Sequence, residues 1–166
     1  MYINRSKGFT LIELLVVIAI IGILSAVVLA SLNSARSKGS DAAIQSDLST
    51  VQIQAEIYYG GTGGNKYNTD GTSGLVSGTC AATANTLFAD TTISNAVNGA
   101  IAANGGAAAS ISRCAVANAG TSYAIAIQSK ATPANWYCSD SSGVSNKVVT
   151  TATPVLGGAT AAAACP

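Results

Sequence analysis

Side chains that could carry out catalysis are scarce in this chain of 166 residues. There is no histidine, which excludes His-based triads, His metal ligands and the usual proton shuttle at neutral pH. Serine is plentiful, but no S-x-x-K or G-x-S-x-G context and no phosphate loop with its lysine is present. Asp90 and Asp140 are candidates for a carboxylate pair, yet nothing in the sequence places them together, and surface turns explain both acids better. The sequence therefore predicts no catalytic residue, no cofactor and no enzyme.

The low charge of the chain argues against some classes of binding partner. Lys and Arg number 8 and Asp and Glu number 7, so the formal net charge is +1. Charged residues are only 9% of the chain, against about a quarter in an average soluble domain. So weak a net charge argues against a nucleic-acid partner held through many phosphates. Hydrophobic residues make up 49% of the chain, and they are concentrated near the N-terminus.

The stretch Leu14–Leu32 is almost entirely apolar, and no charge occurs between Glu13 and Arg36. A membrane-spanning helix needs about 20 such residues, so this stretch predicts one. A short basic leader with Arg5 and Lys7 precedes it. A secretory signal peptide is an alternative, but its apolar region would be about 7–15 residues long. A plain signal anchor is a second alternative, but it leaves Glu13 unexplained, because an acid at the centre of a membrane helix costs about 2.5–3.5 kcal/mol. The other explanation of Glu13 is that it lies at the membrane–water interface, close enough to the helix end to stay hydrated.

Residues 7–14 read K-G-F-T-L-I-E-L, and with the basic leader and the long apolar run they resemble the processing signature of type IV pilins and pseudopilins. The resemblance extends from Met1 to about Tyr59. It implies that a prepilin peptidase cleaves between Gly8 and Phe9 and that the new N-terminal Phe9 is N-methylated. It also implies that Glu13 pairs with the N-terminal amine of a neighbouring subunit, which gives the buried charge a partner that sets the register of subunits.

The same resemblance implies a location and a set of partners. The precursor would cross the bacterial cytoplasmic (inner) membrane once, with its C-terminal domain outside, and would become an extracellular filament on assembly. Arg5 and Lys7 favour a cytoplasmic leader, but Arg36 and Lys38 compete with them, so the orientation rests on the resemblance. The implied partners are prepilin peptidase, the inner-membrane assembly machinery and further copies of the chain. Loss of the leader leaves six basic and seven acidic side chains, a formal charge of −1.

After residue 37 the helical pattern becomes amphipathic. One apolar face is predicted from steps of four and three residues, formed by Ile44, Leu48, Val51, Ala55 and Tyr58. The polar residues placed mainly off that face are Asp41, Gln45, Asp47, Gln52 and Glu56. Many pilins have a proline in the apolar helix, but none occurs here before Pro133, so local melting of the helix is not required by this sequence.

The rest of the chain predicts a small sheet. Residues 60–74 form a glycine-rich loop, in which Asn68, Asp70 and Gly71 only weakly resemble a calcium loop, so no metal site is predicted. A short helix is expected over residues 92–103, and strands over 111–117, 121–129, 135–139 and 144–151. Strand 121–129 alternates large apolar with small or polar residues, which is typical of a half-buried strand. The predicted fold class is α+β, a long N-terminal helix with an antiparallel sheet of three or four strands, as in the pilin fold.

Four parts of the chain follow from these patterns. Residues 1–8 are the predicted prepilin leader, and residues 9–36 are the membrane and filament-core helix. Residues 37–59 are the amphipathic second half of that helix, and residues 60–166 form the globular domain with its antiparallel sheet.

The cysteines Cys80, Cys114, Cys138 and Cys165 all lie outside the apolar segment. An even number in a domain outside the cytoplasm favours disulfides, for which three pairings exist. Zinc is disfavoured because no C-x₂₋₄-C spacing occurs. We expect the sequential pairing, Cys80–Cys114 with Cys138–Cys165, since the second bond would hold a loose C-terminus. A C-terminal disulfide loop is also a recurrent feature of pilins.

The sequence thus predicts the structural subunit of a type IV pilus-like filament. A pseudopilin of a type II-like secretion system is the alternative within the family. A membrane-anchored binding domain that uses a pilin-like anchor is the alternative from another class.

Overall fold

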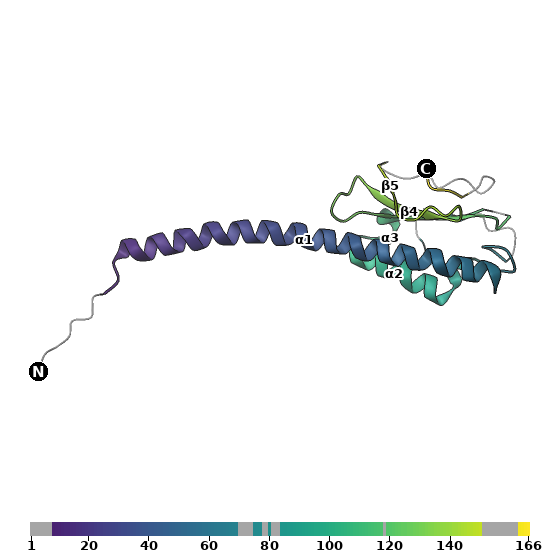
Figure 1. The fold of residues 1–166 in the computed structure, drawn as a ribbon, viewed down its shortest axis with the longest axis horizontal. Coiled ribbons are helices and arrows are strands. Elements are labelled where there is room, and N and C mark those ends of the chain that lie inside the picture. The colour runs from purple at the N-terminus through teal and green to yellow at the C-terminus, as the bar shows by residue number, and fades with distance from the viewer. Residues whose placement is uncertain (1–7, 70–74, 78–79, 81–83, 118, 151–162) are drawn as a thin grey trace, which may run out of the picture. The chain divides into compact units, whose positions relative to one another are not determined.

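The computed structural model describes residues 8–69, 75–77, 80, 84–117, 119–150 and 163–166 (Figure 1). The chain divides into two compact units, Met1–Arg36 and Ser37–Pro166. The helices are α1 (Leu11–Gly60), the 3-10 turn η1 (Leu87–Ala89), α2 (Thr91–Asn104) and α3 (Ala108–Ile111). The strands are β1 (Leu75–Ser77), β2 (Ser112–Val116), β3 (Tyr123–Gln128), β4 (Trp136–Asp140) and β5 (Lys147–Val149). The predicted α+β class, a long helix followed by an antiparallel sheet, is confirmed.

Helix α1 buries one face only after Ser37. Its buried residues there include the five predicted from the spacing, Ile44, Leu48, Val51, Ala55 and Tyr58. After Gly60 the chain leaves the helix in a glycine-rich turn. A Cβ at Gly63 would collide with the carbonyl oxygen of Lys66 and with the Tyr58 ring, so only glycine fits there.

The sheet is an antiparallel meander of five strands in the order β1-β2-β3-β4-β5. Strands β2, β3 and β5 lie within three of the segments predicted from the sequence, and β4 overlaps the fourth but runs one residue further, to Asp140. Helix α2 likewise matches the predicted short helix, and the carboxylate of Asp90 caps its first turn, accepting from the N–H groups of Thr92 (2.9 Å) and Ile93 (3.1 Å). Strand β1 was not predicted, because a run of three residues between glycines is too short to show a period.

The strand predicted over residues 121–129 is confirmed as β3, but the prediction that only one of its faces is buried is wrong. In β3 the side chains of Tyr123 to Ile127 are all buried. Tyr123, Ile125 and Ile127 pack into the core shared with the helices. Ala124 and Ala126 belong to a second cluster on the opposite face.

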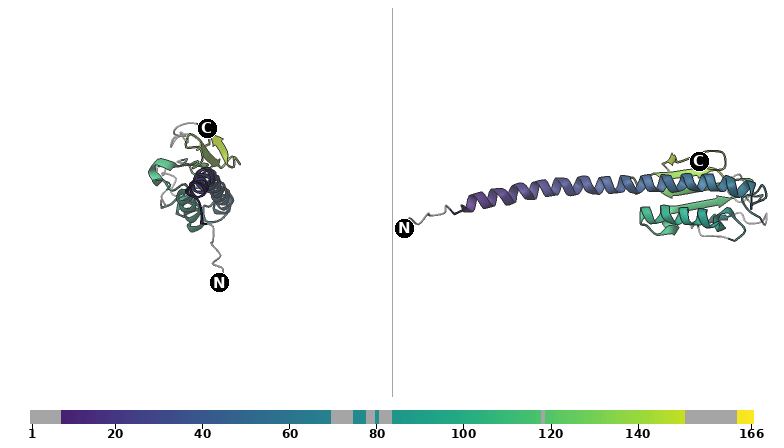
Figure 2. Two further views of the ribbon diagram at one scale, coloured as in Figure 1. Left: turned by 90° about the vertical axis from the view of Figure 1, so that its left-hand side faces the viewer. Right: turned by 60° about the horizontal axis from the view of Figure 1, so that its bottom comes forward.

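The unit Ser37–Pro166 therefore has three layers. The second half of α1 and α2 lie on one face of the sheet, and the C-terminal segment, residues 163–166, lies over the other (Figures 1 and 2). The cluster on this second face contains Ala115, Ala124, Ala126, Trp136, Cys138, Val149 and Ala163, with Cys165 packed against it. The sequence pattern indicated one apolar face per strand. It could not indicate that residues 163–166 would cover the other face of the sheet.

Asp41 was predicted to lie mainly off the apolar face of α1, but it is 6% exposed. Its carboxylate accepts hydrogen bonds from the hydroxyl of Ser129 (2.7 Å) and from the N–H of Lys130 (2.6 Å) in the β3–β4 loop. The hydroxyl of Tyr137 also donates to it (3.2 Å). Burial and the negative charge of Asp41 raise the pKa of Tyr137. The acid is tolerated in the interior because several donors replace its water.

We predict that Leu48→Ala lowers the free energy of unfolding by about 2–5 kcal/mol, because truncating a fully buried leucine leaves a cavity. Ile53→Ala, in the same helix but 67% exposed, should change it by less than about 0.5 kcal/mol. The measurement is denaturant unfolding of the full chain in detergent, followed by fluorescence of the single, buried Trp136. Equal effects of the two substitutions would contradict this assignment of the core face.

Candidate functional site

Residues 8–10 form the entrance to α1. Gly8, Phe9 and Thr10 precede the helix and are exposed, Phe9 to 91%. A Cβ placed on Gly8 would meet no atom within 4 Å. The peptide bond between Gly8 and Phe9, the cleavage point expected from the sequence, thus lies outside the helix on an exposed stretch of chain.

Thr10 and Glu13 form a reciprocal cap at the start of α1. The N–H and the hydroxyl of Thr10 each donate to Oε2 of Glu13 at 2.8 Å, and the N–H of Glu13 donates to the Thr10 hydroxyl oxygen at 3.3 Å. This is the capping box of a T-x-x-E sequence, and an acid in the first turn also suits the helix dipole. Glu13 therefore has local partners, and Thr10 is a site residue that the sequence interpretation missed although its spacing was visible.

The first unit exposes its apolar side chains. Over the described residues α1 is the one helix that is long and apolar enough to cross a membrane, and none of its apolar window is buried. The exposed large apolar residues are Phe9, Leu11, Ile12, Leu14, Leu15, Val16, Val17, Ile18, Ile20, Ile21, Ile23, Leu24, Val27, Val28, Leu29 and Leu32. An apolar surface of this extent requires a cover of lipid or protein.

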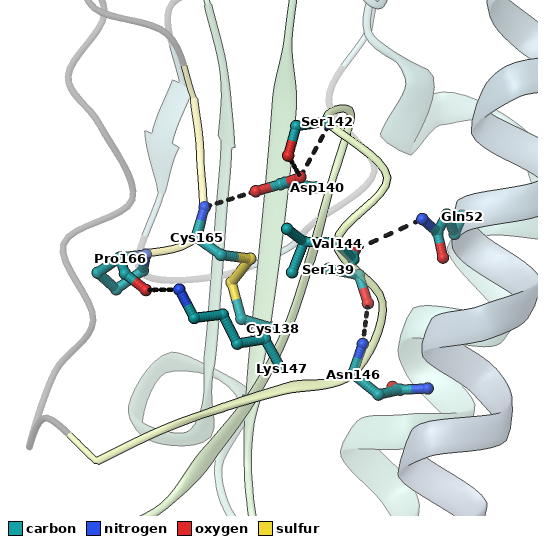
Figure 3. The surroundings of a disulfide bond; sticks show 10 residues. All are labelled: Gln52, Cys138, Ser139, Asp140, Ser142, Val144, Asn146, Lys147, Cys165 and Pro166. Carbon is teal, nitrogen blue, oxygen red and sulfur yellow. Dashed lines mark hydrogen bonds between the residues drawn. A yellow bond between two sulfur atoms is a disulfide. The ribbon is translucent and has the colours of Figure 1, made fainter.

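Both disulfides have the sequential pairing expected from the sequence. Cys80–Cys114 ties the segment after β1 to β2, with Cα atoms 5.2 Å apart. Cys138–Cys165 ties β4 to the C-terminal segment, with Cα atoms 5.9 Å apart (Figure 3). These separations are ordinary for disulfides.

Polar contacts hold the C-terminal segment beside the second disulfide. The N–H of Cys165 donates to Asp140 at 2.8 Å, and the ammonium group of Lys147 donates to the carbonyl oxygen of Pro166 (Figure 3). The hydroxyl and N–H of Ser142 donate to the other oxygen of Asp140 at 2.5 and 2.8 Å. Burial alone would raise the pKa of Asp140, but the hydrogen bonds from Cys165 and Ser142 outweigh it and lower this pKa below its ordinary value.

The β4–β5 loop is in turn fixed to α1. The side-chain amide of Asn146 donates to the Gln45 carbonyl oxygen (3.1 Å) and to the Ser49 hydroxyl (3.0 Å). The Gln52 amide reaches the carbonyl oxygen of Val144 at 3.5 Å (Figure 3). The disulfide loop and the second half of α1 are therefore parts of one packed unit.

The two acids weighed as a catalytic pair have separate local roles. Asp90 caps α2, as described above. The interpretation of Asp140 as a surface turn acid is wrong, because this residue is 2% exposed and binds the C-terminal segment. Among the described residues no group of three or more Cys, Asp or Glu side chains could hold a metal ion. Asp70 and Gly71, from the weak calcium-loop resemblance, lie outside the described residues.

A capped apolar helix followed by a disulfide-bonded sheet domain is similar to the architecture that the resemblance to type IV pilins implies. Comparison with known proteins agrees with this class. Residues 3–29 match the family described as the prokaryotic N-terminal methylation motif. The chain is 46% identical over 55 residues to the type IV wide pilus major component PilA4 of Thermus thermophilus, an alignment that covers 33% of this chain.

That alignment spans 42% of the relative's own length. No solved structure gives a significant match. The motif and the relative support the type IV pilin family for this chain, a family of structural subunits, and the motif and apolar helix fit a membrane-anchored precursor.

The lowered pKa of Asp140 makes a prediction about pH. A carboxyl group whose pKa is lower in the folded state stabilises the fold above its ordinary pKa of 3.8, and this stabilisation is lost as the pH falls through the folded value. Asp140→Asn should therefore destabilise the chain by about 1–3 kcal/mol at pH 7, with a smaller difference from the unmodified chain below about pH 3.8.

The matched control is Asp47→Asn. Burial raises the pKa of Asp47, so removing its charge should leave stability at pH 7 unchanged or higher. Unfolding curves of both variants between pH 2 and pH 7 make the comparison. A loss for Asp140→Asn that does not change with pH would contradict the role of its ionised form.

Proposed function

We propose that this chain is the structural subunit of a type IV pilus-like filament. Prepilin peptidase cleaves the precursor between Gly8 and Phe9, Phe9 is N-methylated, and residues 9–36 pass from the membrane into the filament core. Residues 1–8 are the leader, residues 37–59 continue the helix, and residues 60–166 form the globular domain.

The exposed apolar surface of residues 9–32 is the observation that carries the proposal. A helix that is apolar on all sides is stable in lipid or among other apolar helices, and not in water. In a filament, the apolar segments of neighbouring copies would contact one another and take the place of the lipid. The subunit therefore leaves the membrane without exposing this surface to water.

Glu13 gives the assembly a register. Both donors of Thr10 go to Oε2, and no hydrogen bond from a described residue reaches Oε1. The cap thus holds the carboxylate while one oxygen remains available to an amine. The N-terminal amine of Phe9 on a neighbouring copy is the proposed partner, and a charge pair in an apolar core fixes geometry more than it adds stability.

Processing also changes the charge at the N-terminus of the chain. The leader carries Arg5 and Lys7, which favour the cytoplasmic side of the membrane. Cleavage removes both and creates an α-amine next to the apolar segment. Inner-membrane assembly machinery would then extract the subunit, with the C-terminal domain outside.

Gly8→Glu is expected to block cleavage, because a glutamate would replace the residue next to the scissile bond. A Cβ at Gly8 touches nothing within the chain, so the substitution acts on the peptidase and not on the fold. Gly39→Glu is the matched control, since Gly39 also has open space around its Cβ position. Immunoblots of membranes should show a leader-containing band for the first variant alone. Normal cleavage of Gly8→Glu would contradict the assigned junction.

Glu13→Leu should insert and be cleaved normally, while the yield of sheared filaments falls at least about tenfold, because removing one partner of a buried ion pair costs about 3–5 kcal/mol. Glu13→Gln separates two roles of this residue: it keeps the capping box with Thr10 but loses the charge. Both variants should lose filaments if the charge is required. A normal yield from either variant would show that pairing with an amine is not needed.

A further inference from the structure

A shallow groove runs along one side of α1 in the C-terminal half of its apolar stretch. Its first part is lined by Leu24, Ser25, Val28 and Leu29. Its second part is lined by Leu29, Leu32, Asn33 and Arg36. All of these side chains are exposed, and their spacing of three and four residues puts them on one side of the helix. The groove is therefore apolar at one end and cationic at the other.

The length and position of the groove match one leaflet of a membrane. Glu13 and Arg36 are the charges that bound the apolar stretch, and they lie about 35 Å apart along the helix. The hydrocarbon core of a bilayer is about 30 Å thick, so these charges reach its two surfaces while Leu24 lies near the midplane. From Leu24 to Arg36 the groove extends about 18 Å along the helix. An acyl chain of one leaflet, which covers about 15 Å from the midplane to the headgroup, fits this length.

The cationic end of the groove has no acidic partner in its own unit beyond the distant Glu13. No acidic residue occurs between Glu13 and Asp41, and the Asp41 carboxylate is bound by the β3–β4 loop. The guanidinium group of Arg36 has a planar set of N–H donors that matches two oxygens of a phosphate. Asn33 places an amide one helical turn before it. This end of the groove is suited to an anion held at the membrane surface.

We propose that the groove binds one phospholipid with an anionic headgroup, its acyl chain along residues 24–32 and its phosphate at Arg36. Hydrocarbon then meets leucine and valine, and phosphate meets guanidinium. Phosphatidylglycerol is favoured over phosphatidylcholine, because the choline cation already balances the phosphate charge of the latter, whereas an anionic lipid attracts a basic side chain at the membrane surface.

This inference rests on the membrane-anchored precursor of the proposed function. In that orientation the lipid belongs to the leaflet on the side of the C-terminal domain. Because the same apolar segment would be covered by other copies in a filament, a subunit would release this lipid when it leaves the membrane.

The test is photo-labelling of the full chain in phosphatidylcholine vesicles. One set of vesicles contains a trace of phosphatidylglycerol with a diazirine in one acyl chain, and a second set contains the same trace of diazirine-labelled phosphatidylcholine. Mass spectrometry of the labelled peptides locates the adducts. The unmodified chain should give at least about threefold more adduct with the phosphatidylglycerol probe, concentrated on residues 24–32.

Two pairs of variants separate the headgroup contact from the groove. Arg36→Gln should abolish the preference between the probes, whereas Lys66→Gln, which removes the same charge from an exposed residue outside the apolar stretch, should keep it. Ser25→Leu fills the groove and should lower the phosphatidylglycerol adduct at least about twofold, because the acyl chain loses its contact surface. Ser31→Leu adds the same bulk to this helix outside the groove lining and should leave the adduct unchanged.

Equal labelling by the two probes, adducts spread evenly over residues 9–32, or displacement of the label by inorganic phosphate would overturn the lipid site. A preference retained by Arg36→Gln would do the same. The comparison of the two probes uses the unmodified chain, so it does not depend on the folding of any variant. A chain that fails to sediment with the vesicles would instead overturn the membrane stage of the proposed function.

Discussion

The constraint on which this molecule depends is the uncovered apolar surface at the start of α1. Sixteen large apolar side chains between Phe9 and Leu32 are exposed, and each Å² left in water costs about 25 cal/mol. No part of the described chain relieves that cost. The segment therefore needs lipid or protein around it. Glu13, held by Thr10 at the entrance of the helix, is the single charge that accompanies this surface.

The unit Ser37–Pro166 differs from the first unit, because most of its apolar side chains are buried within the unit itself. Both faces of its sheet are buried, one under the helices and the other under a short C-terminal segment held by Cys138–Cys165 and by Asp140. The core of this unit is formed by its own residues, so the processing and assembly proposed for the first unit do not require that core to change. Exposed large apolar side chains remain on this unit at Ile53, Ile57 and Val148.

The elements with a clear period were predictable from the sequence. The core face of α1, helix α2 and strands β2 to β5 followed from spacing, and the G-F-T-L-I-E stretch indicated the family. Non-local burial could not be predicted in this way. Asp41 and Asp140 are polar in any local pattern, and only the fold brings the β3–β4 loop and Cys165 to their carboxylates. For the same reason β3 was expected to have a wet face that the end of the chain in fact covers.

The most direct test of the central claim is the mass of the N-terminal peptide from protein sheared off cells that produce the full chain. The account predicts a peptide that begins at Phe9 and carries one added methyl group. It would be contradicted by a surface protein that still begins at Met1, or by one cleaved within the apolar segment, because neither product could place an amine beside Glu13 of a neighbouring copy.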